Sequence, residues 1–168
     1  MNVFELTIPG TPVPKGRPRV YRNGGMHGVN PARTLQAEQA IREAWQDEHP
    51  GMLPMEGPVG IRLEFWMPDR HIRDYDNLAK LVTDALNRVA YLDDGQINQA
   101  VIIKHLPDRT VRGARGMRRR HTGDPLACDG QQYEPHTYIR INNTQGKKEQ
   151  NDHDHHRQAR PGRALARR

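Results

Sequence analysis

The chain has 168 residues, of which 26 are Lys or Arg and 20 are Asp or Glu, for a formal net charge of +6. The apolar fraction is 35% and the aromatic fraction is 5%, which suits one modest hydrophobic core with part of the chain outside it. The single cysteine, Cys128, excludes an internal disulfide framework. No apolar run approaches the roughly 20 residues of a membrane-spanning helix, and no signal-peptide pattern is present, so we expect a cytoplasmic protein without a membrane partner.

The N-terminal part of the chain predicts a strand, a hairpin and a helix. Residues 3–8 alternate apolar and polar side chains, as a strand does. The Asn-Gly-Gly turn signal at 23–25 separates residues 17–22 from residues 26–30, which favours an antiparallel hairpin. A helix is expected to begin at Asn30, as N-cap, because a proline follows it. Apolar side chains then recur at helical spacing at Ala37, Ala40, Ile41, Ala44 and Trp45.

The middle of the chain predicts a strand–helix–strand unit. Residues 59–67 alternate cleanly, which indicates a strand with one buried face. The helix that follows has the strongest periodicity in the chain, and Asp76 is its expected N-cap. Residues 97–106 predict another strand. The apolar face of this helix consists of Leu78, Leu81, Val82, Ala85, Leu86 and Val89.

The C-terminal part carries most of the excess positive charge. Residues 107–134 are rich in Arg, Gly and Pro without any period, so we predict a flexible insertion there, followed by a closing strand at 136–141. Residues 143–168 are expected to form a disordered basic tail rich in His and Arg. We therefore predict an α/β (α+β) fold in one small domain, residues 1–142, with two main helices packed on a mixed β-sheet. This charge distribution indicates a polyanionic partner such as nucleic acid, although a basic tail that only aids solubility has the same composition.

Acidic side chains surround the second predicted helix. Asp74 and Asp76 lie where a loop meets its N-terminus, and Lys80 lies one turn after Asp76 on the same face. Asp93 and Asp94 follow the helix. They can approach Asp74 and Asp76 only if the strands on either side of the helix are adjacent in the sheet.

Carboxylates brought together in this way repel one another unless a cation joins them. Oxygen ligands with open positions suit Mg²⁺, with Mn²⁺ as a substitute, and such an ion activates water and orients a phosphodiester. Lys80 would add a fixed positive charge beside the scissile phosphate. A purely structural interpretation is also open: Asp76 as a helix cap, Lys80 as a partner of Asp76 or Asp84, and residues 93–95 as a turn.

The spacing of these residues resembles a known family. The sequence D-Y-D-N-L-A-K at 74–80, with D-A-L at 84–86 and L-D-D at 92–94, is similar to the signature of RusA-type Holliday junction resolvases, especially their phage and prophage members. The segments M-P-D-R at 67–70 and P-K-G-R-P-R at 14–19 resemble the same family. The resemblance covers about residues 3–141, and the long Arg-rich insertion departs from it.

The resemblance implies a homodimeric, Mg²⁺-dependent endodeoxyribonuclease that nicks two strands of a four-way DNA junction symmetrically in recombination and repair. The essential carboxylates of the family correspond to Asp74, Asp76 and Asp94, and its catalytic lysine corresponds to Lys80. Asp93 occupies the neighbouring position and is expected to be an auxiliary metal ligand. No phosphate-binding loop is present, so no nucleotide cofactor is expected. Two further side chains are expected to support this set from outside: Asp84, by orienting Lys80, and Asn77.

Six basic side chains are candidates for DNA contacts. The side chains at 15–22 form a basic strip, which either contacts phosphate or is a solvated face of the hairpin. The side chains at 70–73 either bind phosphate or neutralise Asp69. Two other functions fit the same sequence: a non-catalytic nucleic-acid-binding protein, and a metal-dependent nuclease that acts on other branched DNA or on RNA. The six candidates are Lys15, Arg17, Arg19, Arg22, Arg70 and Arg73.

Overall fold

A four-stranded mixed sheet is the centre of the molecule. The computed structural model describes residues 2–21 and 27–144. Along the sheet the strand order is β1-β10-β4-β5; β10 is antiparallel to both of its neighbours, whereas β4 and β5 are parallel. The four strands are β1 (Val3–Pro9), β4 (Val59–Trp66), β5 (Ile97–His105) and β10 (His136–Asn143).

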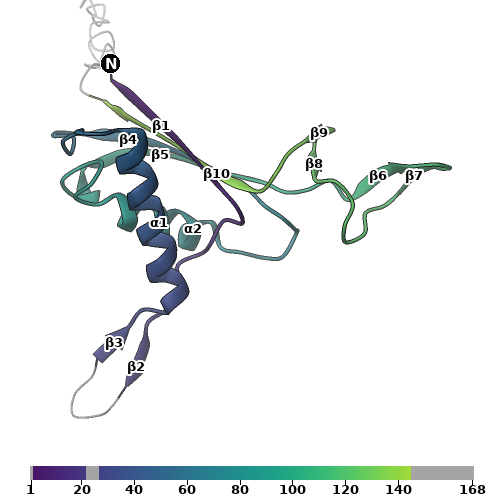
Figure 1. Ribbon diagram of the computed structural model, residues 1–168, viewed down its shortest axis with the longest axis horizontal. Helices are drawn as coiled ribbons and strands as arrows, with labels where there is room; N and C mark the ends of the chain where they lie inside the picture. Colours follow the sequence, from purple (N-terminus) through teal and green to yellow (C-terminus); the bar gives the residue numbers. More distant parts are fainter. Residues whose placement is uncertain (1, 22–26, 145–168) are drawn as a thin grey trace, which may run out of the picture.

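Two helices, α1 (Ala32–Glu48) and α2 (Tyr75–Leu86), cover one face of this sheet (Figure 1). The predicted α+β class is therefore confirmed. Every second residue of β4 points into the core, as its alternation predicts, and meets the apolar faces of the helices. Among the described residues, neither helix is both long and apolar enough to cross a bilayer. The core includes Ile41, Trp45, Leu63, Phe65, Leu78, Val82, Leu86, Ile139 and Ile141.

The strand–helix–strand unit predicted from the middle of the chain is present as β4, α2 and β5. A crossover helix of this kind is what allows two parallel strands to be neighbours. Because β4 and β5 run in the same direction, the loops that follow them leave from the same edge of the sheet. The loop after β4 leads to Asp74 and α2, and the loop after β5 leads into the Arg-rich insertion.

Both predicted helix caps are wrong by one or two residues. Pro31 has ψ 140° and occupies the N-cap position of α1, so Asn30 is not the cap. Asp74 has ψ 131° and precedes α2, so Asp76 lies inside the first turn. Neither cap residue makes a side-chain capping hydrogen bond. A carboxylate in the first turn still interacts favourably with the helix dipole, so Asp76 suits its place.

The insertion is not a structureless loop, contrary to our prediction. It forms two small hairpins, β6 (Thr110–Gly113) with β7 (Gly116–Arg119), and β8 (Ala127–Cys128) with β9 (Gln131–Gln132). Short hairpins of this kind lack the long alternating pattern that marks a strand. The closing strand β10 is present but lies in the middle of the sheet, between β1 and β4.

A further hairpin confirms the prediction for the N-terminal turn: β2 (Arg19–Tyr21) pairs with β3 (His27–Val29). Arg22 and the tail from residue 145 onward lie outside the described residues.

The segment between β1 and β2 is held against both helices by Lys15. Its backbone N–H donates to the carbonyl of Asn77 at 2.8 Å, and its Nζ donates to Glu38 Oε1 at 3.2 Å and to a carboxylate oxygen of Asp84. Glu38, on α1, is only 6% exposed. Partial burial opposes it, yet the hydrogen bonds and charges of Asp84 and Glu38 raise the pKa of Lys15. Lys15, which we expected to contact DNA, instead makes internal ion pairs.

Replacing Lys15 with Met should destabilise the fold by about 1–3 kcal/mol, because the Glu38 carboxylate is left buried without its ammonium partner. Urea denaturation of the two proteins measures this difference. The control is Arg33→Met on the exposed side of α1, which should change stability by less than about 0.5 kcal/mol. Equal stability of the Lys15 and Arg33 variants would contradict the anchoring role.

The loop between β4 and α2 is closed by an ion pair. The Arg73 guanidinium binds both carboxylate oxygens of Asp69, at 2.6 and 3.0 Å, and the backbone N–H of His71 donates to the same carboxylate at 2.9 Å. The hydrogen bonds from Arg73 outweigh partial burial and, with that N–H, lower the pKa of Asp69 from 3.8 to about 2. Of the two alternatives for Arg73, neutralisation of Asp69 is the one that the structure contains.

This shift predicts how stability depends on pH. Because the folded-state pKa of Asp69 is lower than the unfolded one, its carboxylate stabilises the fold above pH 3.8, and the contribution disappears as the pH falls towards 2. The stability difference between the native protein and Asp69→Asn should therefore shrink over that range in chemical denaturation. Asp47→Asn, which changes an exposed carboxylate of α1, should show no comparable trend. A constant Asp69 difference from pH 6 to pH 2 would contradict this assignment.

Candidate active site

The segment after α2 folds back along the helix, and Tyr91 fixes that return. The Tyr91 side chain is fully buried, and its hydroxyl donates to the carbonyl of Thr83 at 2.8 Å. The carbonyl of Tyr91 in turn accepts from the N–H of Arg88, which has a positive φ of 63° at the turn. Burial raises the pKa of Tyr91. This anchored turn returns the chain to the middle of α2, where Asp94 begins the short 3₁₀ helix η1 (Asp94–Gln96).

Lys80 is the point at which the residues before and after this turn meet. Its Nζ lies 2.9 Å from Asp84 Oδ1 and 3.6 Å from Asp94 Oδ2. The Lys80 side chain is 55% exposed, so the ammonium is open to a ligand from solvent. The hydrogen bond that Lys80 donates to Asp84 outweighs partial burial and, with the charge of Asp94, raises the pKa of Lys80. The contact expected between Asp84 and Lys80 is therefore present.

Asp84 is shared by two lysines. One of its oxygens accepts from Lys80 and the other from Lys15. Burial alone would favour the neutral acid, but the hydrogen bonds and charges of the two ammonium groups outweigh it and lower the pKa of Asp84. Asp84 stays ionised, with both oxygens occupied.

Asp74 and Asp76 lie at the N-terminus of α2 with their carboxylates exposed to solvent. Asn77 supports both of them: its side-chain amide donates to Asp74 Oδ2 at 3.4 Å, and its backbone N–H donates to Asp76 Oδ1 at 2.8 Å. Among the described residues, neither carboxylate forms an ion pair with a cationic side chain. Asn77 thus contacts both predicted metal ligands, and its supporting role stays a prediction.

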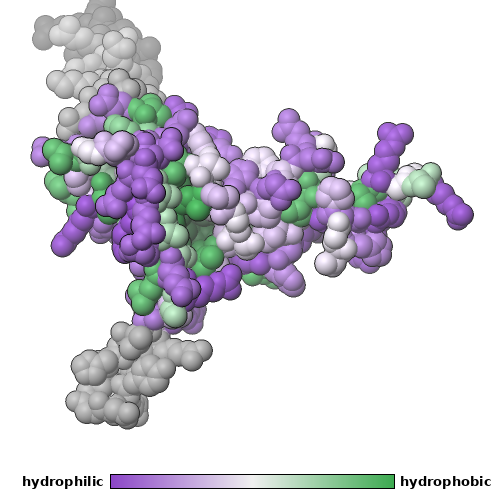
Figure 2. All heavy atoms as spheres, in the orientation of Figure 1, coloured by the Kyte–Doolittle hydropathy of each residue, from purple (hydrophilic) through white to green (hydrophobic). Residues whose placement is uncertain are grey.

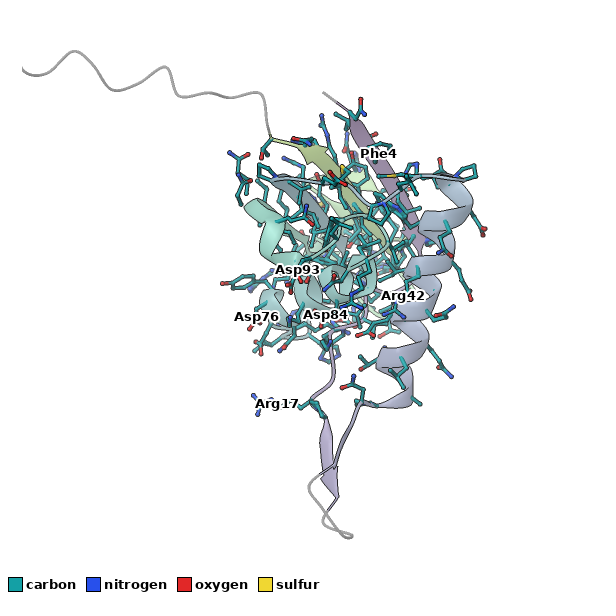
Figure 3. The ribbon with its side chains drawn as sticks, turned by 90° about the vertical axis from the view of Figure 1, so that its left-hand side faces the viewer. Phe4, Arg17, Arg42, Asp76, Asp84 and Asp93 are labelled. Carbon is teal, nitrogen blue, oxygen red and sulfur yellow. The ribbon has the colours of Figure 1, made fainter. Side chains whose placement is uncertain are left out.

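Asp93 stabilises the turn that leads into η1. Its Oδ1 accepts from the backbone N–H of Gly95 at 2.8 Å, and the Gln96 side chain accepts from the Asp93 N–H, so the pair forms a capping box around η1. Gln96 is itself held by the carbonyls of Met55 and Gly57. Figure 3 shows Asp93 and Asp76 on the same side of the molecule, with Asp84 between them and α1.

The carboxylate oxygens of this set suit a hard divalent cation, but they are not clustered into a complete metal site. Asp74, Asp76 and Asp94 offer carboxylate oxygens open to solvent around one face of α2, which suits Mg²⁺. Within residues 2–21 and 27–144, however, no three carboxylate, imidazole or thiol groups lie close enough together to hold a metal ion. The metal-binding role of these residues and of Asp93 therefore stays a prediction.

Two of the basic candidates are engaged by other residues of the protein, and one is exposed. Arg70 donates to the carbonyl of Pro107 at 2.7 Å, and Arg73 is bound to Asp69, so both brace the loop before Asp74. Arg17 is exposed and stands clear of the packed body near the start of β2 (Figure 3). The backbone of Arg19 lies in β2, but its side chain is outside the described part of the structure.

Sequence reasoning missed two features of the site. Glu38 lies on the buried face of α1, one turn before Arg42 and beside Lys15, and completes the network behind Asp84. A charged residue in register with the apolar stripe at Ile41 was the available signal, because a buried carboxylate needs a partner. The other feature is the exposed Tyr75, which separates Asp74 from Asp76 and is 59% accessible.

Comparison with known proteins identifies the family of the chain. Residues 9–112, which contain every candidate from Lys15 to Asp94, match the family described as Endodeoxyribonuclease RusA. The crossover junction endodeoxyribonuclease RusA of Escherichia coli strain K12 is 34% identical over 112 residues, and that of Enterobacteria phage 82 is 30% identical. Each alignment covers 62% of this chain and 84% of the relative. The chain therefore belongs to the RusA family of endodeoxyribonucleases.

Proposed function

We propose that this protein resolves Holliday junctions by Mg²⁺-dependent hydrolysis of phosphodiester bonds, with paired nicks made by a homodimer. The relatives named above are crossover junction endodeoxyribonucleases. The match to the family covers residues 9–112, which contain the whole candidate site. The observation that carries the proposal is the contact between Lys80 on α2 and Asp94 beyond it, because it joins the two halves of the acidic motif on one surface. We place the activity in the cytoplasm of a bacterial cell or phage-infected host.

The residues of this site divide the chemistry between them. Asp74, Asp76 and Asp94 would hold the cation, which supplies a Lewis acid for the phosphate and a more acidic bound water. Lys80 stabilises the negative charge that develops on the phosphoryl oxygens, and it keeps its proton because Asp84 and Asp94 raise its pKa. Asp84 is a positioning residue, since both of its oxygens are already occupied by lysines.

A dimer suits the substrate on symmetry grounds. A four-way junction has approximate two-fold symmetry, so a two-fold dimer can present one site to each of two opposed strands. Simultaneous engagement of two strands also favours the branched substrate over linear duplex, because the second contact forms at high effective concentration.

The central test is Asp74→Asn on a synthetic four-way junction with Mg²⁺ and with EDTA. Nicking should fall by more than about 100-fold, since a metal ligand is lost, a larger effect than loss of a residue that only supports a ligand. Junction binding should persist, because removal of a negative charge does not weaken attraction to phosphate. Asp47→Asn should nick like the native protein. If Asp74→Asn nicks as fast as the native protein, the assignment of Asp74 as a metal ligand is wrong.

The same assay with a substrate panel separates the remaining functions. A Holliday junction resolvase should nick the four-way junction in preference to flaps, forks, linear duplex and RNA, and both nicks should lie at symmetric positions. Preferential cutting of a different branched substrate would contradict the proposal that the protein resolves Holliday junctions, but it would support a nuclease activity. Binding without any cutting by the native protein, with Mg²⁺ or Mn²⁺, would leave a nucleic-acid-binding protein.

The role of Asp84 is tested by the pH dependence of nicking. Asp84→Asn removes the largest cause of the raised pKa of Lys80, so activity should be lost at lower pH on the alkaline side than in the native protein. Lys15→Met removes the other contact of Asp84 but leaves its contact with Lys80. This variant should therefore lose activity at the same alkaline pH as the native protein. An unshifted profile in a folded Asp84→Asn protein, checked by thermal unfolding, would show that Asp84 has only a structural role.

A further inference from the structure

The hairpin β6–β7 is an arm that departs from the body of the protein. It extends from the edge of the sheet at which β5 ends (Figure 1), and hydrophilic side chains dominate it in the space-filling view (Figure 2). The match to the RusA family ends at residue 112, so β7 and the turn that follows it lie beyond that match.

The pairing register gives the arm one covered face and one free face. Arg118 lies opposite Val111, and its guanidinium binds both carboxylate oxygens of Asp124, at 2.7 and 2.8 Å, so the turn at 120–124 folds over that face. Arg120 holds the same turn through the carbonyls of Asp124 and Pro125. Two of the arginines thus have a structural role within the arm.

The opposite face carries charge without internal partners. Thr110 pairs with Arg119, and Arg112 pairs with Met117, so these four side chains share one face of the ribbon. Arg112 and Arg119 are exposed, and in the described part of the chain neither side chain makes a hydrogen bond or ion pair. Arg115 stands exposed at the tip, and Met117 is 68% exposed. An uncompensated arginine face of this kind attracts a polyanion.

The base of the arm is tied to the loop that leads to Asp74. Arg70 donates to the carbonyl of Pro107, and Tyr133 donates to the carbonyl of Met67 at 2.6 Å. Between the arm and this loop lies an open groove of about 750 Å³. Its two carboxylates are engaged, Asp69 by Arg73 and Asp108 by the backbone N–H groups of residues 129 and 130. Its basic lining consists of Arg70, His71, Arg109, Arg119, Arg120 and His121.

We propose that the free face of the β6–β7 arm binds the sugar–phosphate backbone of duplex DNA in an arm of the junction. The inference rests on the proposed function, and it names a second DNA contact beside the acidic site. Guanidinium groups bind phosphate oxygens through two parallel N–H donors, and a two-stranded ribbon is narrow enough to follow a DNA groove. Backbone contacts carry no base information, so the arm adds affinity independent of sequence.

The experiment compares three variants of the full chain on a plain linear duplex. The first neutralises the free face, Arg112→Gln with Arg119→Gln; the second keeps its charge, Arg112→Lys with Arg119→Lys. The third is a control for net charge that removes two exposed arginines elsewhere, Arg33→Gln with Arg140→Gln, of which Arg140 lies 3.6 Å from Glu5 Oε1. Dissociation constants are measured by fluorescence anisotropy over a range of salt concentrations, and thermal unfolding checks each fold.

Neutralising the free face should weaken duplex binding by roughly 10- to 60-fold near 0.1 M salt, and it should lower the slope of log K against log salt by about 0.9 for each phosphate that is no longer neutralised. The Lys pair should keep most of the affinity, and the Arg33 and Arg140 control should keep all of it. Equal affinity and equal salt slope for the neutralised and native proteins would overturn the inference. So would an equal loss in the control, since it would show a general effect of net charge.

A second measurement separates this inference from the proposed function. At saturating protein, the neutralised variant should nick a four-way junction at the native rate, because the arm does not touch the reacting atoms. A large fall in that rate would overturn a purely binding role for the arm. If the native protein nicks no junction, the proposed function fails, yet the duplex-binding comparison still decides whether the arm binds DNA.

Discussion

Asp84 is the residue on which the arrangement of the site depends. Its carboxylate is half-buried and holds two ammonium groups, one from the segment between β1 and β2 and one from its own helix. Through Lys15 it connects to Glu38 on α1, and through Lys80 it connects to Asp94 beyond α2. Four separate parts of the chain are thus fixed by alternating charges. Each ion pair offsets the desolvation cost of its neighbour, because an isolated charge at that depth would be strongly unfavourable.

The charges on either side of this network are placed unequally. Behind Asp84 the carboxylates and cations are matched. At the N-terminus of α2, Asp74 and Asp76 face solvent, and no cationic side chain of residues 2–21 or 27–144 forms an ion pair with them. A fold tolerates such a pair at a helix N-terminus, where the dipole favours negative charge. The same two groups therefore destabilise the free protein little and are available to a cation. Lys80 stands at the boundary between the matched and unmatched regions.

The parallel pairing of β4 and β5 decides where the arginines of the insertion lie relative to the acidic motif. The loop that carries the acidic motif and the insertion that carries the arginines both leave from the same edge of the sheet. Hydrogen bonds from Arg70 and Tyr133 then join the two loops. The arginines of the insertion are distant from the acidic motif in the sequence. These hydrogen bonds hold them on the same side of the molecule as the candidate site.

The sequence alone determined the features that depend on local periodicity: the alternation of β4, the apolar face of α2 and the motif from Asp74 to Asp94. Tertiary structure decided what depends on contacts between distant residues. In the sequence, Lys15 is one more cation in a basic strip. Its side chain points into the protein because it forms ion pairs with the buried Glu38 and with Asp84. Likewise, β10 reads as a terminal strand, yet it pairs with both β1 and β4 in the centre of the sheet. Pairing partners and burial are set by the whole chain, whereas a periodic pattern reports only which face of an element is apolar.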